Sequence, residues 1–339
     1  MSLWMSWAGL AACATLILAA GTALSRYGDV IARRTGLGGG WIGLVLMASV
    51  TSLPELVTAM SAVTIADVPD IAVGNALGAC VLNLAMLVVL DVMHRRQSMY
   101  ALASQGHILG AAFGIVMLGV VGFDVLAAPR LAMSWGHVGM STPLLLGLYG
   151  IAIRTIFRYE RAAVAAAHAA EVAAAPAEPQ ASELTLRQAA ARYAAAAAVV
   201  ISAALWLPFV ASGLAEAAGW SDSFVGTMLV AFTTTLPELT VTITSVRLGA
   251  LDMAIGNLVG SNLFNIAILG VADLAYLKGV LLAAAAPAHA LSAVAATVMS
   301  GALIVALVAR PQARVLNLVG WTSMLIGLSF FANAWLHYR

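Results

Sequence analysis

Two short segments of the chain repeat each other, and they decide the fold. Residues 49–56 read SVTSLPEL, and residues 232–239 read FTTTLPEL, 183 positions later. Residues 74–83 read GNALGACVLN, and residues 256–265 read GNLVGSNLFN, 182 positions later. The second offset also relates three pairs of titratable residues: Asp70 and Asp252, Asp91 and Asp273, and His107 and His289. This agreement predicts an internal repeat that relates the two halves of the chain.

The sequence around these segments is unusually apolar. Of its 339 residues, 62% are hydrophobic and 9% are charged, with a mean hydropathy of +0.98 and a net charge of +1. A soluble domain is closer to one-quarter charged, so a soluble enzyme, a nucleic-acid-binding protein and a disordered chain are all excluded. Cys13 and Cys80 lie inside apolar runs and are predicted to be small buried residues, with no disulfide and no metal between them.

The apolar residues fall into segments that are long enough, or nearly so, to cross a bilayer, which takes about 20 residues. Ten such spans are predicted, at residues 3–24, 40–64, 71–93, 102–126, 138–156, 190–211, 224–246, 251–275, 288–309 and 314–336. The first is interpreted as an uncleaved span because no basic segment precedes it and Arg26 follows it.

The basic residues predict the orientation of these spans. With the N-terminus outside, 13 of the 16 Lys and Arg residues fall on the cytoplasmic side. The chain is therefore predicted to be a multi-pass protein of the cell (inner) membrane, with both termini outside. Its expected surroundings are the lipid bilayer, and neither nucleic acid nor an obligate protein partner is expected.

The spans divide into two sets of five. Residues 1–156 are predicted to form the first five-helix repeat and residues 190–339 the second, joined by a cytoplasmic Ala-, Pro- and Glu-rich linker at 157–189. Because five is odd, the second repeat enters the membrane in the opposite sense. Inverted repeats are typical of secondary transporters, whose binding site lies between the repeats near the middle of the membrane.

The repeated LPEL segments place a glutamate inside an apolar span. A charge at the bilayer centre costs on the order of 3 kcal/mol, so Glu55 and Glu238 need a partner or a function. The preceding Pro54 and Pro237 lack an N–H group and leave a carbonyl free four residues earlier. These carbonyls and the neighbouring hydroxyls belong to Val50, Thr51, Ser52, Thr233, Thr234 and Thr235. Such oxygen-rich helix breaks are typical of Na⁺ and Ca²⁺ sites, whereas a kinked helix with a hydrogen-bonded glutamate is the alternative.

The second pair of segments adds amides and close packing. Glycines four residues apart form a smooth strip where another helix can approach closely. Asn83 and Asn265 can offer a neutral carbonyl oxygen to a cation. Ser261 lies one turn before Asn265, but its repeat counterpart is Ala79, so the two halves of the predicted site differ.

Together, TSLPE with GNALGACVLN and TTLPE with GNLVGSNLFN resemble the two α-repeats of the calcium/cation antiporter superfamily, known for sodium/calcium exchangers. The resemblance implies an all-α integral membrane fold of ten helices in two inverted repeats. It also implies alternating access, in which the first and sixth helices slide past a fixed core, and a central Ca²⁺ site flanked by Na⁺ sites. The ion ligands that it implies are the carboxylates of Glu55 and Glu238, the amides of Asn83 and Asn265, the hydroxyls of Ser52, Thr235 and Ser261, and the backbone oxygens of Ala48, Thr51, Ala231 and Thr234.

Many members of the superfamily carry Asp at the position of Asn265 and a hydroxyl at that of Ala79. The central site would therefore have a formal charge of −2 from two glutamates, which balances one Ca²⁺ or two Na⁺. Exchange of Na⁺ for Ca²⁺ is the predicted function, without a cofactor. A Ca²⁺/H⁺ or other cation antiporter is the alternative, and an intramembrane hydrolase or a non-transporting scaffold is less favoured. No Arg or Lys lies near either glutamate in sequence to bind a phosphate.

Two further repeated pairs have weaker functional signals. Asp91 is expected to form an ion pair at the end of a helix with Arg95 and Arg96. His107 and His289 are expected to have a helix-end or packing role, with proton transfer as the alternative.

Overall fold

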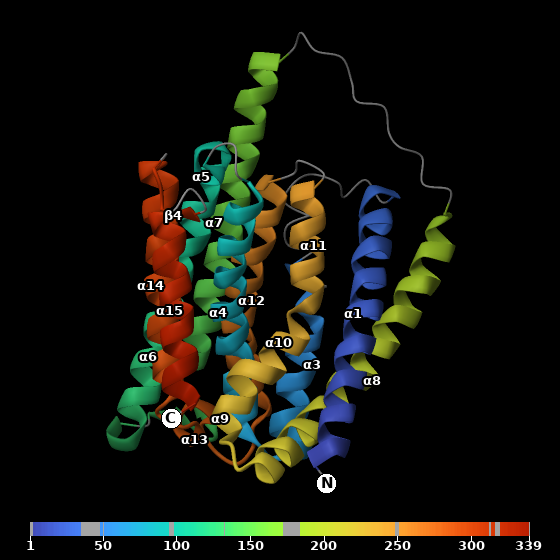
Figure 1. The fold of residues 1–339 in the computed structure, drawn as a ribbon, viewed down its shortest axis with the longest axis vertical. Coiled ribbons are helices and arrows are strands. Elements are labelled where there is room, and N and C mark those ends of the chain that lie inside the picture. Colours follow the sequence, from blue (N-terminus) through green and yellow to red (C-terminus); the bar gives the residue numbers. More distant parts are fainter. Residues whose placement is uncertain are drawn as a thin grey trace.

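The computed structural model describes residues 3–34, 48–49, 51–94, 98–131, 133–171, 184–247, 251–311, 313–315 and 319–338, which form one helical bundle (Figure 1). The first half comprises α1 (Leu3–Arg34), α3 (Leu53–Ser61), the π-helical segment η1 (Ala62–Ala66), α4 (Pro69–Met93), α5 (Met99–Leu102), α6 (Gly106–Leu131), β1 (Ser134–Trp135), β2 (Val138–Gly139) and α7 (Ser141–Glu171). The second half comprises α8 (Leu186–Ala218), α9 (Asp222–Phe224), the π-helical segment η2 (Val225–Val230), α10 (Ala231–Thr234), α11 (Leu236–Arg247), α12 (Leu251–Ala275), α13 (Leu281–Ala284), α14 (His289–Ala309), β3 (Arg314–Val315), β4 (Val319–Gly320) and α15 (Trp321–Tyr338).

Within the described residues, six helices are long and apolar enough to cross a membrane: α1, α4, α6, α8, α12 and α14. A seventh span is formed if Asp222–Thr234 and Leu236–Arg247 are counted together, although they meet at an angle of 44°. Residues 40–47 and Val50 of the predicted second span lie outside the described residues. The chain is therefore an all-helical, multi-pass membrane protein, and the count of ten spans stays a prediction.

The two GN-containing helices, α4 and α12, form the centre of the bundle. Within their most apolar stretches, 67% of the residues of α4 and 72% of those of α12 are buried, against 33% for α1. The helix α1 packs chiefly along α8, and Figure 1 shows this pair at one edge of the bundle. The repeated GN segments therefore lie on the two most enclosed of the six long helices.

Glycines on α4 allow η2 to approach the centre closely. A Cβ atom at Gly74 would lie 2.9 Å from the Thr227 nitrogen, and one at Gly78 would overlap the Thr227 carbonyl oxygen. On the facing side, a Cβ at Gly226 would lie 2.9 Å from the Ile71 Cα. The segment η2, which leads into α10 and α11, thus packs against the predicted glycine strip of α4.

Short elements outside the long helices also repeat, and they correct two predicted span boundaries. The predicted spans 138–156 and 314–336 begin in the hairpins β1–β2 and β3–β4, and their helices start only at Ser141 and Trp321. The turns α5 and α13 are related by the same 182 positions as the GN segments. Hydropathy alone placed these boundaries too early because the hairpins contain Trp135, Val138, Val315 and Val319.

The segment predicted as a linker begins as helix. The helix α7 continues to Glu171, and Figure 1 shows its end extending beyond the neighbouring helices. Residues 172–183 lie outside the described part of the chain. The following helix, α8, begins at a capping box in which Thr185 and Gln188 exchange hydrogen bonds of 3.2 and 3.0 Å.

Candidate ion-binding site

Both LPEL segments interrupt their helices at equivalent positions. Ser52 has φ −88° and ψ 12°, and Thr235 has φ −82° and ψ 3°, just before α3 and α11 begin. The proline two residues later cannot continue the hydrogen-bond ladder of the preceding helix. As a result, Glu55 and Glu238 both lie in the first turn of a new helix, in the interior of the bundle.

The two glutamates are fully buried, and a hydrogen bond links the helix breaks that carry them. The Ser52 hydroxyl donates a 2.8 Å hydrogen bond to Glu238 Oε1 and so joins the two repeats. The other oxygen of Glu238 and both oxygens of Glu55 have no hydrogen-bond partner among the described residues. Buried carboxylate oxygens without partners are costly, and a cation bound between them would remove that cost.

The central helices α4 and α12 bring the predicted amides to the same region. They touch where Asn262 Nδ2 donates to the Cys80 carbonyl (3.3 Å) and the Cys80 thiol donates to the Asn262 carbonyl (3.6 Å). Asn83 and Asn265 follow three residues later on each helix and are fully buried. Their amide oxygens and the Ser261 hydroxyl have no partner among the described side chains and backbone.

The unpaired oxygens suit a hard cation in kind and number. Six of them belong to predicted ligands: two on Glu55 and one each on Glu238, Asn83, Asn265 and Ser261. Ca²⁺ takes six to eight oxygen ligands in proteins. In the described part of the chain, no group of three or more His, Cys, Asp or Glu side chains could hold a metal ion. An ion between the two glutamates would therefore need the neutral oxygens as well.

Two of the predicted backbone ligands, the Ala48 and Ala231 carbonyls, accept hydrogen bonds in this conformation. The Ala48 carbonyl accepts from Ser52 N (3.0 Å) and Thr51 Oγ1 (3.3 Å). The Ala231 carbonyl accepts from Thr235 N (3.0 Å), Thr234 Oγ1 (3.2 Å) and Thr235 Oγ1 (2.9 Å). A hydroxyl that donates its proton keeps its lone pairs, so the Thr235 hydroxyl can still bind an ion, whereas the Ala231 carbonyl already has three donors around it. Ala79 is fully buried on α4 and offers no side-chain oxygen.

Asn75 is a site residue that the sequence reasoning did not assign. Its Nδ2 donates to the Glu55 carbonyl (3.1 Å), and its Oδ1 accepts from the Thr234 hydroxyl (2.9 Å). The side chain is fully buried and links the helix break of one repeat to that of the other. The available signal was its repetition as Asn257.

The repeated titratable residues pair across the repeats at the helix ends. His107 lies 3.0 Å from Asp252, and His289 lies 3.0 Å from Asp70. Asp91 accepts from Gly320 N (2.7 Å), and Arg314 lies 3.6 Å from it. Arg95 and Arg96, its predicted partners, lie outside the described residues. The corresponding Asp273 accepts from Gly139 N (2.8 Å).

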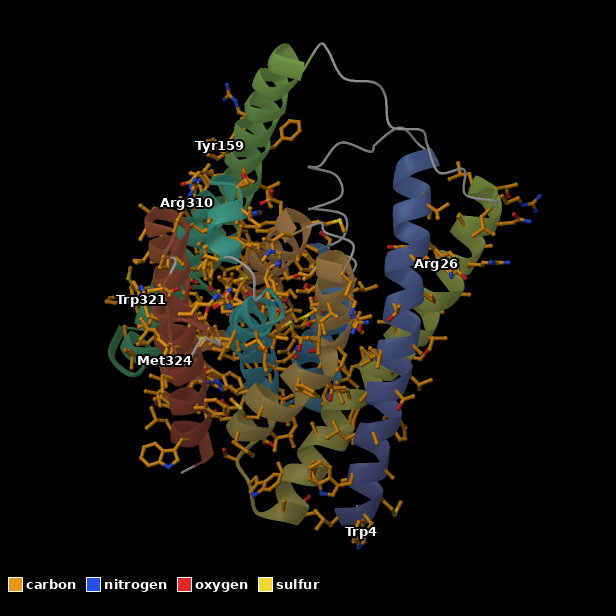
Figure 2. All side chains as sticks on the ribbon, turned by 45° about the horizontal axis from the view of Figure 1, so that its top comes forward. Trp4, Arg26, Tyr159, Arg310, Trp321 and Met324 are labelled. Carbon is orange, nitrogen blue, oxygen red and sulfur yellow. The ribbon has the colours of Figure 1, made fainter. Side chains whose placement is uncertain are left out.

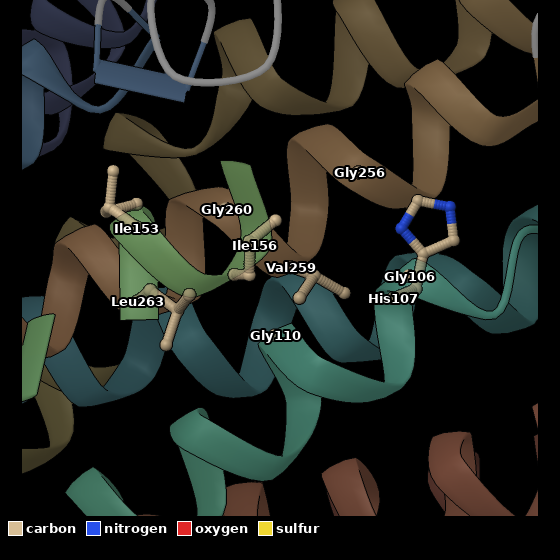
Figure 3. Close-up of a pocket in the computed structure, with 9 residues that line it drawn as sticks. All are labelled: Gly106, His107, Gly110, Ile153, Ile156, Gly256, Val259, Gly260 and Leu263. Atoms are coloured by element: carbon tan, nitrogen blue, oxygen red, sulfur yellow. The ribbon is translucent and has the colours of Figure 1, made fainter. Parts of the chain in front are cut away.

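A small apolar pocket lies apart from the glutamates. Figure 3 shows His107 on α6, Ile156 on α7 and Val259 on α12 around it. Neither Glu55 nor Glu238 lines it, and its walls are mostly glycine and aliphatic side chains. Its lining offers no oxygen set comparable to that of the two repeated motifs.

Two similar proteins match most of the chain, and a third matches a shorter stretch at higher identity. The inner membrane protein YrbG of Escherichia coli is 27% identical over 256 residues, covering 71% of this chain and 70% of the relative. The putative antiporter CaxA of Alkalimonas amylolytica is 27% identical over 277 residues, covering 79% of each chain. The sodium/calcium exchanger MaX1 of Methanosarcina acetivorans is 49% identical over 63 residues, which is 18% of each chain.

Solved structures share the fold at lower identity. The sodium-calcium exchanger NCX_Mj superposes with a TM-score of 0.62 at 20% identity, covering 97% of this chain and 98% of the other. Native YfkE gives a TM-score of 0.66 at 16% identity, covering 97% and 91%. The sodium/calcium exchanger protein family matches residues 5–158 and 189–335, which include both repeated motifs. The chain belongs to the sodium/calcium exchanger protein family and is a membrane cation antiporter.

Proposed function

We propose that this antiporter exchanges Na⁺ for Ca²⁺ by alternating access to one central site. The observation that carries the proposal is the pair Glu55 and Glu238, one from each repeat, fully buried with unpaired oxygens. Two carboxylates balance one Ca²⁺ or two Na⁺, so either cargo neutralises the site in turn. The similarity to the sodium/calcium exchanger MaX1, which is 49% identical over 63 residues, supports this choice.

The proposed ligands come from both repeats, five from the first and six from the second. Glu55 and Glu238 would bridge the ions, while neutral oxygens complete the shell. The neutral ligands would be the side chains of Asn83, Asn265, Ser52, Thr235 and Ser261 and the backbone oxygens of Thr51, Thr234, Ala48 and Ala231. The absence of a hydroxyl at Ala79 would weaken one monovalent position on the side of the first repeat.

The proposed location is a cell (inner) membrane, crossed ten times, with both termini outside and the 157–189 linker in the cytoplasm. Figure 2 shows Arg310 toward one end of the bundle and Trp4 at the other, and the uneven split of the basic residues supports the proposed orientation. Large apolar side chains are exposed on the outward surfaces of the helices, including Phe123 (72%) and Phe331 (70%). Such side chains fit a lipid-facing surface.

The test is radioactive Ca²⁺ uptake into proteoliposomes that contain the purified protein. An outward Na⁺ gradient should drive uptake, whereas a pH gradient of the same size and direction without Na⁺ should not. Empty liposomes under both gradients provide the control. Uptake driven by the pH gradient alone would replace Na⁺ with H⁺ as the coupling ion, and uptake under neither gradient would reject Ca²⁺ as the cargo.

A further inference from the structure

The repeat allows each buried contact to be compared with its own counterpart. Several contacts between the halves occur twice in this conformation, with equivalent residues exchanged. They are His107–Asp252 with His289–Asp70, Asp91–Gly320 with Asp273–Gly139, and the reciprocal contact of Cys80 with Asn262. A contact that both copies make at the same time does not distinguish one conformation of an inverted repeat from the other.

The contacts of Asn75 occur only once. Its amide donates to the Glu55 carbonyl and accepts from the Thr234 hydroxyl. The counterpart Asn257 would need the Glu238 carbonyl and the Thr51 hydroxyl. Instead, Asn257 Nδ2 lies 3.5 Å from Thr242 Oγ1, and its Oδ1 has no partner among the described residues. Thr51 Oγ1 lies 3.3 Å from the Ala48 carbonyl, as Thr234 Oγ1 lies 3.2 Å from the Ala231 carbonyl, but the Thr51 hydroxyl does not also donate to the asparagine Asn257.

Side-chain chemistry explains only part of this difference: Thr242, which Asn257 contacts, corresponds to Ala59 in the first repeat. Both copies have Asn on the central helix, Glu after the proline and Thr before it, so the same two hydrogen bonds are available to each. Both asparagines are buried, at 0% and 1% exposure, so neither amide is satisfied by bulk solvent. Ser52 and Thr235 are less informative, because their side chains differ. The Thr242 contact, at 3.5 Å, is at the outer limit of a hydrogen bond and leaves Asn257 Oδ1 unpaired, so the asymmetry of Asn75 and Asn257 follows chiefly from the placement of the helices.

We propose that Asn75 is a positioning residue that stabilises the present conformation, and that Asn257 takes the equivalent role in the opposite one. The two conformations of an inverted repeat are related by exchange of the roles of its halves. After the exchange, Asn257 would donate to the Glu238 carbonyl and accept from the Thr51 hydroxyl, while Asn75 would lose its partner. Each asparagine would thus stabilise the helix break beside one of the glutamates, and would do so in one conformation only. This inference rests on the alternating access of the proposed function, and not on the identity of the ions.

The experiment measures the populations of the two conformations without any transported ion. Spin labels at cysteines replacing Ala217 on α8 and Ala283 on α13, in a Cys13→Ala/Cys80→Ala background, report the position of α8 relative to the core. Both positions are exposed, and the C-terminal end of α8 and the turn α13 lie toward the same end of the bundle (Figure 1). Their distance distribution is recorded by pulsed electron paramagnetic resonance in buffer free of Na⁺ and Ca²⁺.

Asn75→Ala should shift the ratio of the two distance populations about five-fold from that of the unsubstituted chain, as expected for about 1 kcal/mol of buried hydrogen bonding. Thr234→Val, which leaves Asn75 in place but removes its donor, should shift the ratio in the same direction. Adding Asn257→Ala to Asn75→Ala should return the ratio towards its original value, because both states then lack the contact. The matched control is Asp252→Ala, which removes one copy of the His–Asp contact that both repeats make and should leave the ratio unchanged.

A merely structural role for the asparagines predicts a different result. An unchanged ratio in Asn75→Ala, or a double variant that stays at or moves beyond the shifted ratio, overturns the proposal. Because no ion is added, a failure of Ca²⁺ or Na⁺ transport would leave this result interpretable. Conversely, a failed population shift would leave the exchange of Na⁺ for Ca²⁺ standing.

Discussion

Glu55→Gln and Glu238→Gln are each expected to reduce Ca²⁺ transport at least about 100-fold, corresponding to about 3 kcal/mol of lost ion stabilisation. Each substitution leaves a net charge of −1 against a divalent cation in a fully buried site. The glutamine keeps the shape of the side chain, so the helices should still pack. The measurement is the initial rate of radioactive Ca²⁺ uptake per reconstituted molecule.

The matched control for these variants is Glu216→Gln, because Glu216 is exposed near the end of α8. It should transport at the unsubstituted rate. Size-exclusion chromatography of all three variants separates loss of transport from loss of folding. A rate near that of the unsubstituted chain in either Glu55→Gln or Glu238→Gln would show that the two glutamates do not form the Ca²⁺ site together.

Gly78→Ala is expected to destabilise the bundle by about 2–3 kcal/mol or more. The added methyl group would overlap the Thr227 carbonyl oxygen and lie 2.8 Å from the Ala231 Cβ. The overlapping Thr227 oxygen belongs to the backbone, so η2 would have to move away from α4 to remove the overlap. The measurement is size-exclusion chromatography after heating in detergent. The temperature at which half of the monodisperse peak is lost should fall by several degrees.

Gly114→Ala and Gly301→Ala are the controls for this prediction. Both glycines lie inside long helices, and a Cβ at either would have open space within 4 Å. Replacing glycine by alanine within a helix stabilises it by about 0.5–1 kcal/mol. These variants should match or exceed the unsubstituted chain in heat resistance. Equal resistance of Gly78→Ala would contradict the close contact between α4 and η2.

The sequence was most informative where apolar length and repetition agreed. The predicted span 251–275 coincides with α12, and the predicted span 288–309 differs from α14 by one residue. The repeat also related His107 to His289 and Asp70 to Asp252. It did not show that each histidine pairs with the aspartate of the other half, because a repeat gives equivalence and not contact.

Local hydropathy was not enough to predict the two hairpins or the role of Asn75. Val138 and Val315 are as apolar as residues of a span, yet they belong to short strands that precede α7 and α15. Asn75 depends on Glu55, 20 residues earlier, and on Thr234, 159 residues later, so its role required the packed helices. The glutamates could be found from sequence since a charge inside an apolar span needs no tertiary information to stand out.

The most direct test of the central claim is the amount of Ca²⁺ bound by the purified protein at equilibrium in Na⁺-free buffer. One central site formed by both glutamates predicts one high-affinity Ca²⁺ per chain, displaced by Na⁺ and lost in both Glu55→Gln and Glu238→Gln. High-affinity binding of Ca²⁺ that persists in both variants, or no binding by the unsubstituted protein, would contradict the account.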